Sequence, residues 1–347
     1  MTCYSATVSC LNSNPAVAPI QLDFGVLMHA NPHGLIVILS GGNGTMPTYA
    51  PGADSTFATN YYNNGYTVVQ TKWGGGTTPW ELANGSNDYN VLQAACRPAG
   101  FLYYARYNTN PQNGPVLFPT TQTAGMCVHG FSAGSAAAAF VLAWYGGASF
   151  IDKVELLSGP VVSDIAQGCV VPPPPHGIDI CGTNPSYCQG WPAGGLIESP
   201  DYVFGTEDHI RMWTGDNSCR GPQNTTQASY NAWLAQSIVN GPNGGGGNFL
   251  YPKTAMQAWL CSSDTDGTYN ESGPQGWIFY SQVAQQSSLP NNFLVNAVGS
   301  CGEPEGVVTG YVSSTSRFYP NSKGVDAITT DMSDLAHSQT VACQNLH

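Results

Sequence analysis

The chain has 347 residues, of which 9 are Lys or Arg and 21 are Asp or Glu, so the net charge is −12 and the charged fraction is 9%, against about 25% in an average soluble domain. Nine cationic side chains are too few for a basic surface that binds nucleic acid, and no apolar run reaches the roughly 20 residues that span a bilayer. Hydrophobic residues make up 42% of the chain, which indicates a packed core in a single domain over residues 1–347.

The first predicted elements alternate between strands and helices. Residues 1–30 alternate weakly between polar and apolar side chains and predict two edge strands. Residues 35–39 are continuously apolar, which is typical of a strand buried on both faces of a sheet. A helix is then predicted over residues 54–63, a second strand over residues 66–71 and a long helix over residues 87–106.

The same alternation continues and is then interrupted. Residues 124–129 predict a strand that runs into an alanine-rich helix over residues 135–145, and residues 153–157 predict the next strand. Residues 161–250 hold four cysteines and little periodicity, so we interpret them as an irregular, cap-like insertion. The pattern resumes with a strand over residues 254–260, a helix over 276–285 and a strand over 293–298. This order predicts an α/β fold with a doubly wound, mostly parallel sheet.

Eleven cysteines indicate disulfides and therefore an oxidising, extracellular location. The odd number leaves one thiol unpaired, and we expect it to be Cys127, because a buried strand holds a free thiol as a small hydrophobic side chain. The other ten would form five bridges. The shortest gaps, Cys3 to Cys10 and Cys181 to Cys188, would each close a small loop.

The strongest chemical signal is the G-x-S-x-G motif at residues 130–134, between a predicted strand and a predicted helix. A serine on such a tight turn has its hydroxyl lifted out of the sheet, and the flanking glycines allow the neighbouring backbone to approach closely. The helix after the serine directs its first amides toward the same point, which favours an oxyanion. This context makes Ser132 the candidate nucleophile.

On this motif, the glycine-rich turn at residues 40–44 and the order of the elements, the chain resembles the α/β-hydrolase superfamily over most of residues 30–345. The serine motif and the cysteine content look like those of secreted esterases and polyesterases. The resemblance implies an oxyanion hole made by the amide of Ala133 and an amide of Gly41, Gly42 or Asn43. It also implies a catalytic triad in the chain order serine, acid, histidine.

Several carboxylates are candidates for the acid of this triad. Asp264 comes after the strand predicted over residues 254–260, which is where the superfamily places its acid, and Asp266 lies two residues further on. Asp208 is a rival within the insertion, at the end of a short G-x-x-D sequence, and Asp164 comes after the strand before the insertion. We take Asp264 as the leading candidate and leave the others open.

The base is expected to be His337, because it comes after Asp264 in the chain and His347 is the terminal residue. This choice requires a loop of more than 30 residues after the last predicted strand. A bridge between Cys261 and Cys301, which lie just past consecutive predicted strands, would brace the acid and histidine loops. His129 is unsuitable as the base, because it lies in a strand three residues before the serine and is expected to point elsewhere.

These observations predict a secreted, monomeric serine hydrolase that cleaves neutral carboxylic esters, either small esters, acyl sugars or polyesters, through an acyl-enzyme. No metal or organic cofactor is expected, because the predicted acyl-enzyme chemistry requires none. A peptidase or amidase on the same scaffold is the first alternative. A non-catalytic binding module is the second.

Overall fold

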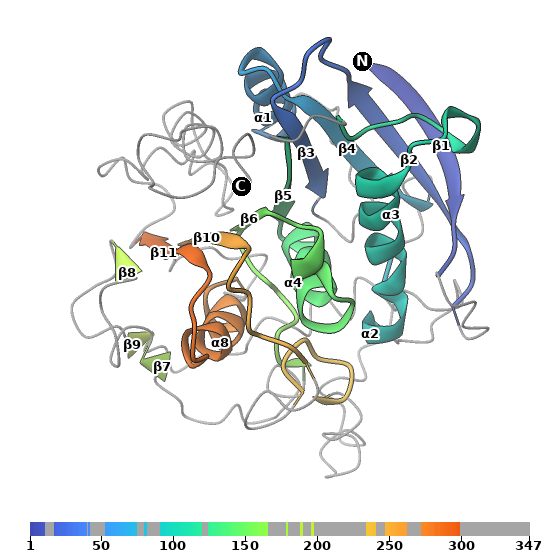
Figure 1. Cartoon of the computed structure of the whole chain (residues 1–347). Coiled ribbons are helices and arrows are strands. Elements are labelled where there is room, and N and C mark those ends of the chain that lie inside the picture. The colour runs from blue at the N-terminus through green and yellow to red at the C-terminus, as the bar shows by residue number, and fades with distance from the viewer. Residues whose placement is uncertain are drawn as a thin grey trace.

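Figure 1 shows the computed structural model of the chain as a twisted central sheet with helices on both faces. The structure describes residues 1–10, 17–39, 41, 53–74, 80–81, 91–119, 124–165, 178–179, 188–189, 196–197, 234–240, 247–261 and 272–298.

Within the described residues, the main sheet has nine strands in the order β1-β2-β4-β3-β5-β6-β10-β11-β8. Their bounds are β1 Thr2–Val8, β2 Ile20–Leu27, β3 Gly34–Leu39, β4 Thr67–Trp73, β5 Gly125–Phe131, β6 Lys153–Leu157, β8 Cys188–Gln189, β10 Ala255–Cys261 and β11 Asn291–Val298. Strand β2 is antiparallel to both β1 and β4, and the pairs from β4 to β8 are all parallel. The carboxyl ends of β3, β4, β5, β6, β10 and β11 therefore meet at one edge of the sheet, which we call the carboxyl edge.

Two helical layers cover the sheet. The described α-helices are α1 Ala53–Asn63, α2 Val91–Ala94, α3 Cys96–Tyr107, α4 Ala133–Trp144 and α8 Ser272–Ala284. Side chains of α3, α4 and α8 share one large buried cluster with the sheet, whereas α1 belongs to a second cluster on the opposite face. In Figure 1, β3 and β5 lie between α1 and the pair α3 and α4. Two 3-10 helices, Pro111–Asn113 and Gly147–Ser149, come after α3 and α4.

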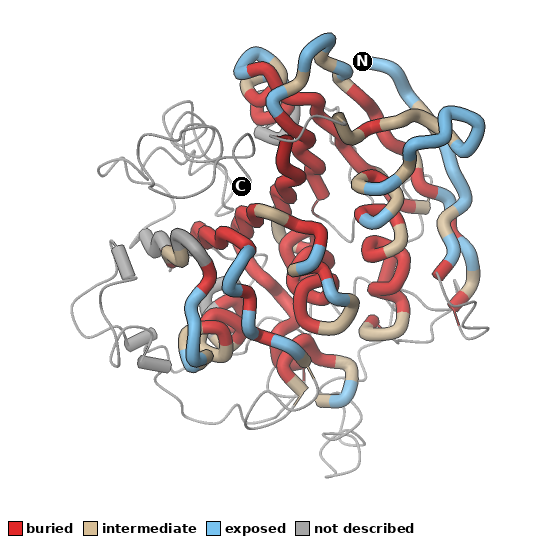
Figure 2. The backbone as a smooth tube through the Cα atoms, viewed as in Figure 1, coloured by how far each residue is buried: buried red, intermediate tan, exposed pale blue. Residues whose placement is uncertain are grey.

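The central strands are buried along their whole length, as Figure 2 shows, whereas β1 at the edge of the sheet is largely exposed. Successive side chains of β5 enter opposite clusters, with Met126 and Val128 facing α3 and α4 and Cys127 facing α1. Burial on both faces explains why β3 is apolar without alternation.

The predicted doubly wound α/β fold is confirmed, and each strand and helix predicted before residue 160 appears within a few residues of its expected place in the sequence. Of the two predicted edge strands, only β1 lies at the edge, because β2 pairs with both β1 and β4. One helix is divided: the stretch predicted over residues 87–106 is described as α2 and α3, which are separated at Ala95. Pro98 explains the division, because it has no N–H to donate to the carbonyl of Ala94 four residues earlier.

The expected insertion contributes strand β8, which pairs with β11 and extends the sheet at that edge. Two further short strands, β7 Ile178–Asp179 and β9 Leu196–Ile197, pair with each other. Residues 237–239 return to the main body, where the carbonyl of Ile238 accepts a 2.9 Å hydrogen bond from the indole nitrogen of Trp144 on α4. The described parts of residues 161–250 thus include contacts with the sheet edge and with α4.

The disulfide pairing differs from the expectation in two respects. Cys127 is disulfide-bonded, so the expectation that it is the free thiol is wrong. The free cysteine among the described residues is Cys3, which is exposed on β1, and Cys10 pairs with Cys96 instead of closing a short loop with Cys3. A buried apolar strand does not exclude a disulfide, because pairing depends on what the fold brings against the sulfur and not on the polarity of the strand.

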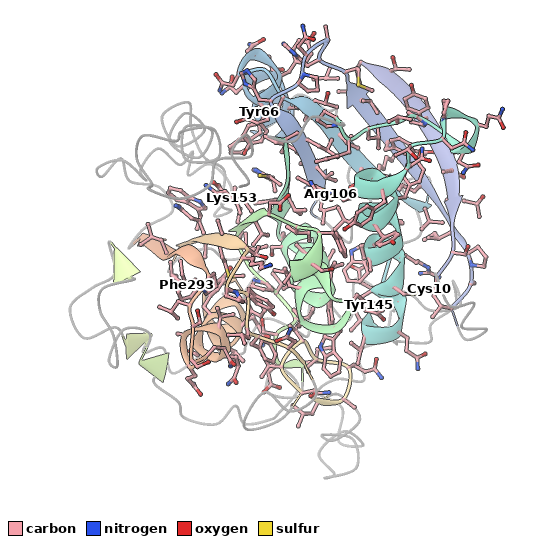
Figure 3. All side chains as sticks on the ribbon, in the orientation of Figure 1. Cys10, Tyr66, Arg106, Tyr145, Lys153 and Phe293 are labelled. Atoms are coloured by element: carbon pink, nitrogen blue, oxygen red, sulfur yellow. A yellow bond between two sulfur atoms is a disulfide. The ribbon has the colours of Figure 1, made fainter. Side chains whose placement is uncertain are left out.

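The bridge from Cys10 to Cys96 joins the N-terminal hairpin to the start of α3. The two cysteines are 86 residues apart in the chain. Tyr145, at the end of α4, packs against them, and Figure 3 labels Tyr145 and Cys10 in this region. A cross-link over so long a loop restricts the unfolded chain and is typically worth about 2–4 kcal/mol of stability.

Candidate active site

Ser132 lies on a strained turn between β5 and α4. Its backbone has φ 52° and ψ −114°, outside the regions that ordinary residues favour. The turn requires glycine at position 130, since a Cβ there would lie 2.7 Å from the carbonyl oxygen of Gly134 and 2.8 Å from the Cα of Ser135. Strain of this kind persists only where the surrounding structure enforces it, and it concentrates at functional sites.

Hydrogen bonds of the backbone hold this turn, and none among the described residues uses the serine hydroxyl. The amide of Ser132 donates a 2.9 Å bond to the carbonyl of Leu157 on β6. Its carbonyl accepts bonds from the amide of Ala136 at 3.1 Å and from the Oγ of Ser135 at 2.5 Å. Although Ser132 is the residue before the first residue of α4, its side chain does not cap that helix. The half-buried hydroxyl is therefore available for chemistry.

The N-terminus of α4 supplies the electrostatics of the turn. Ala133 is the first residue of this 12-residue helix, and its amide is among those without a carbonyl partner inside the helix. The helix dipole adds partial positive charge at the same point. An oxyanion formed beside Ser132 would be stabilised by this amide and by the helix dipole. This is the role that the family resemblance implied for Ala133.

The turn after β3 lies beside the serine. Gly41 is buried, and a Cβ on it would come within 2.7 Å of the Cδ1 atom of Phe131, the residue before Ser132. Of the three residues expected to supply the second oxyanion amide, Gly41 is therefore adjacent to the turn that carries Ser132, which we call the nucleophile turn. Gly42 and Asn43 lie outside the described residues.

A second strained serine, which the sequence did not predict, stands at the end of the neighbouring strand. Ser158 comes directly after β6 and also has φ 52°. Its amide donates a 2.9 Å hydrogen bond to the carbonyl of Trp259 on β10. The sequence offered one signal, since Gly159 and Pro160 after an apolar strand indicate a turn, although they do not indicate its backbone angles.

His129 is oriented away from the nucleophile turn, as its position in β5 suggested. Its Nδ1 atom is 2.9 Å from the hydroxyl of Tyr61 on α1, and its ring packs on Phe57. The side chain is fully buried, and this burial lowers the pKa of His129 to about 3, so the ring is neutral near pH 7. A neutral histidine held by α1 is part of the core.

Buried polar groups accompany His129 in the central strands. Lys153 and Glu155 on β6 are both fully buried, and their charged atoms are 3.6 Å apart; Lys153 is labelled in Figure 3. Glu155 also accepts a 3.2 Å bond from the indole nitrogen of Trp259. The bond between Trp259 and Glu155 joins β10 to β6.

Of the acid candidates, the structure describes only Asp164. It is buried at 5% exposure, and its backbone amide and carbonyl both bond to the side chain of Gln275 on α8. Asp264, Asp266 and Asp208 lie outside the described residues.

The expected base, His337, and its rival His347 also lie outside the described residues, as does Cys301 of the bridge proposed with Cys261. Within the described ranges, no group of three or more His, Cys, Asp or Glu side chains could hold a metal ion. The described helices include none that is long and apolar enough to cross a membrane.

No protein-family model matches the chain, and no curated protein sequence matches it. Several solved structures are similar to it in the path of the backbone through the fold. An arylesterase matches with 10% identity and a TM-score of 0.49 over 96% of this chain and 84% of that chain. A thermophilic esterase from the planctomycete Thermogutta terrifontis, with propionate bound, matches with 10% identity and a TM-score of 0.47 over 97% of this chain and 96% of its own. Brefeldin A esterase, a bacterial homologue of human hormone-sensitive lipase, matches with 11% identity and a TM-score of 0.49 over 96% and 76%.

Because the sequence identities are 10 to 11% and the TM-scores are below 0.5, we assign the fold from the features of this chain and not from these matches. A mostly parallel sheet carries a G-x-S-x-G serine on a strained turn between its fifth strand and the next helix. A glycine turn after β3 lies beside that serine. This combination is the one that defines the nucleophile turn of the α/β-hydrolase fold, and the chain has that fold.

Proposed function

We propose that this protein is a serine hydrolase that cleaves carboxylic esters with Ser132 as its nucleophile. The observation that carries the proposal is the turn at Ser132, where backbone strain, a hydroxyl that does not cap the helix and a helix N-terminus coincide. A serine in this position with only a structural role would be expected to use its hydroxyl to cap the helix, which Ser132 does not do.

In the proposed reaction, the Oγ of Ser132 attacks the ester carbonyl carbon while its proton passes to the imidazole of His337. The oxyanion that forms is stabilised by the amide of Ala133 and by an amide of the turn that contains Gly41. The alcohol then leaves with the proton from His337, and an acyl-enzyme remains on Ser132. Water, deprotonated by the same imidazole, hydrolyses the acyl-enzyme and restores the serine.

Asp264 is our proposed partner for His337. It would accept a hydrogen bond from the Nδ1 atom of the imidazole, which fixes the tautomer and stabilises the imidazolium. Strand β10 ends at Cys261, three residues before Asp264, and its parallel pairing with β6 brings that end to the carboxyl edge where Ser132 lies. Asp266 lies on the same segment and is the next candidate. Asp208 has no comparable support.

The charge of the chain bears on the class of substrate. A net charge of −12 repels anionic substrates at long range, so we propose neutral esters, either small esters, acyl sugars or polyesters. The disulfide between Cys10 and Cys96 and the bonded state of Cys127 support an oxidising, extracellular location. We propose that the enzyme acts as a monomer.

A peptidase or amidase would use the same nucleophile turn, and a non-catalytic binding protein could retain the fold. The turn favours an enzyme over a binding protein, because a serine hydroxyl that does not cap the helix and lies at its positive end has a use in catalysis.

The test is hydrolysis of p-nitrophenyl acetate, with and without a fluorophosphonate that labels activated serines. We expect turnover that the fluorophosphonate abolishes at one label per chain. Ser149→Ala serves as the control, because this exposed serine after α4 bonds within its own turn and should leave the turnover unchanged. Absence of both turnover and label would favour the binding protein, and cleavage of an anilide at a rate comparable to that of the matched ester would favour the amidase.

A further inference from the structure

The turn after β6, formed by Ser158, Gly159 and Pro160, is held from several sides. The amide of Ser158 bonds to the carbonyl of Trp259 on β10 at 2.9 Å. The carbonyl of Gly159 accepts a 2.7 Å bond from the hydroxyl of Tyr280 on α8. The carbonyl of Pro160 accepts a 3.2 Å bond from Ser163. Backbone groups of all three residues are therefore fixed by partners in β10, in α8 and in the segment after the turn.

The same turn touches the nucleophile turn directly. Leu157, the last residue of β6, accepts the bond from the amide of Ser132. Gly159 packs so closely on α4 that a Cβ at this position would overlap the Oγ of Ser135. That Oγ in turn donates its 2.5 Å bond to the carbonyl of Ser132. A shift of Gly159 would therefore displace Ser135 and, through it, the backbone of Ser132.

Helix α8 fixes the segment after β6 at two points. Tyr280 is fully buried, and burial raises the pKa of its hydroxyl well above the usual value, so the group stays a hydrogen-bond donor. Five residues earlier in the helix, Gln275 bonds to both the amide and the carbonyl of Asp164, at 2.7 and 3.0 Å. An amide side chain that satisfies both backbone groups of one residue holds that residue in a fixed place.

Strand β10 and helix α8 are consecutive in the described part of the chain. Strand β10 ends at Cys261 and α8 begins at Ser272, so the two elements bound the segment that contains Asp264 and Asp266. The elements that hold the turn after β6 are thus the same elements that set the two ends of the segment with the acid candidates.

We propose that the turn Ser158–Pro160 positions the nucleophile, and that Tyr280 and Gly159 are positioning residues for the reaction at Ser132. The inference rests on the proposed function. Tyr280 fixes the carbonyl of Gly159, Gly159 sets the place of Ser135, and Ser135 holds the carbonyl of Ser132. Neither positioning residue touches the substrate, so both act on the rate of attack and not on substrate binding.

The first test is Tyr280→Phe, which removes one hydroxyl and leaves the carbonyl of Gly159 without its donor. We expect kcat for p-nitrophenyl acetate and the rate of fluorophosphonate labelling to fall together by about tenfold, with KM unchanged. Tyr251→Phe is the matched control. Tyr251 is also fully buried in the same core cluster, but its hydroxyl has no hydrogen-bond partner among the described residues, so the substitution should leave kcat and the labelling rate unchanged.

The second test is Gly159→Ala, alone and combined with Ser135→Ala. The single variant should lower kcat and the labelling rate about 10²-fold, because the added methyl group displaces Ser135. Ser135→Ala alone should also lower kcat, because it removes the bond to the carbonyl of Ser132. It also removes the atom that the methyl group would overlap, so the double variant should be no less active than Ser135→Ala alone. Gly100→Ala on α3 is the control, since its Cβ would meet only the carbonyl of Ser9, at 3.4 Å.

Circular dichroism and thermal melting would establish that each variant is folded. If Gly159→Ala fails to fold, Tyr280→Phe decides the question alone. Folded variants that keep kcat within twofold of an active parent would overturn this inference and leave the proposed function standing. An inert parent, with neither turnover nor label, would overturn the proposed function and this inference together.

Discussion

Two serines stand at the carboxyl ends of neighbouring strands, Ser132 after β5 and Ser158 after β6. Both have a φ of 52°. The amide of each donates a 2.9 Å hydrogen bond to the next strand, that of Ser132 to Leu157 on β6 and that of Ser158 to Trp259 on β10. The two serines therefore share their φ angle and the way in which their amides bond to the next strand.

The two serines differ in the element on their carboxyl side and in their exposure. Helix α4 begins directly after Ser132, whereas Gly159 and Pro160 come after Ser158. Ser132 is half-buried, whereas Ser158 is only 6% exposed. Backbone strain therefore does not by itself identify a nucleophile. We propose Ser132 as the nucleophile because, of this pair, it is the serine with an accessible hydroxyl at the positive end of a helix.

The largest expected effect on turnover is that of removing the Ser132 hydroxyl, and it distinguishes Ser132 from Ser158. Ser132→Ala should lower turnover by about 10⁶-fold, because loss of a triad nucleophile removes the covalent route. The protein should remain folded, since the backbone bonds of Ser132 do not involve its side chain. Esterase assays with circular dichroism check this result, and turnover within tenfold of the parent would remove Ser132 from the mechanism.

A smaller effect is expected when the strain at Ser132 can no longer be accommodated. Gly130→Ala places a Cβ against backbone atoms of Gly134 and Ser135, which cannot move without shifting α4. We expect kcat to fall by about 10²-fold and the stability to fall by about 1–3 kcal/mol. Urea unfolding and steady-state kinetics measure the two quantities. Parent-like values for both would mean that the turn is not under the constraint described.

The strand that leads to Ser132 contains His129, which should make the stability of the protein depend on pH. His129 on β5 is the register partner of Glu155 on β6. Burial lowers the pKa of His129 to about 3, against about 6.5 in the unfolded chain. The unfolded state therefore binds this proton at a higher pH, and protein stability falls as the pH drops from 6.5 toward 3, by about 1.4 kcal/mol per pH unit.

This prediction is checked by urea unfolding at several pH values. His129→Asn should show a shallower loss of stability across the window than the parent, whatever its stability at pH 7. The exposed His33, changed to Asn, is the control and should keep the slope of the parent. Parallel slopes for parent and His129→Asn would show that His129 is not held neutral in the fold.

The smallest effect is expected at the second serine. Ser158→Ala should lower turnover by less than tenfold, because Ser158 is only 6% exposed and no helix begins directly after it. Steady-state kinetics on p-nitrophenyl acetate measure this. A loss comparable to that of Ser132→Ala would make the Ser158 hydroxyl a participant in the reaction and end the distinction between the two serines.

Local patterns predicted the central fold well. The continuously apolar stretch that became β3 is buried on both faces, as its composition indicated. Strand β6 is buried as well, although it contains Lys153 and Glu155. The G-x-S-x-G motif located Ser132 because its glycines and its strand and helix neighbours are all local in sequence. The two-residue strand β8 carries no pattern of its own and depends on its pairing with β11.

Features that depend on distant contacts were not predictable. The strain at Ser158 is held by Trp259 and Tyr280, more than 100 residues away, and no local pattern encodes such partners. The disulfide of Cys127 was missed for the same reason, because the argument for a free thiol used only the polarity of its strand. Asp264, His337, Gly42 and Asn43 remain predictions from the sequence.

The most direct test of Ser132 as the nucleophile is to map the fluorophosphonate adduct by mass spectrometry. We predict one adduct per chain, on the peptide that contains Ser132, formed at a rate that parallels the loss of esterase activity. An adduct on Ser158 or on any other serine, or full esterase activity in protein that takes no label, would contradict this assignment.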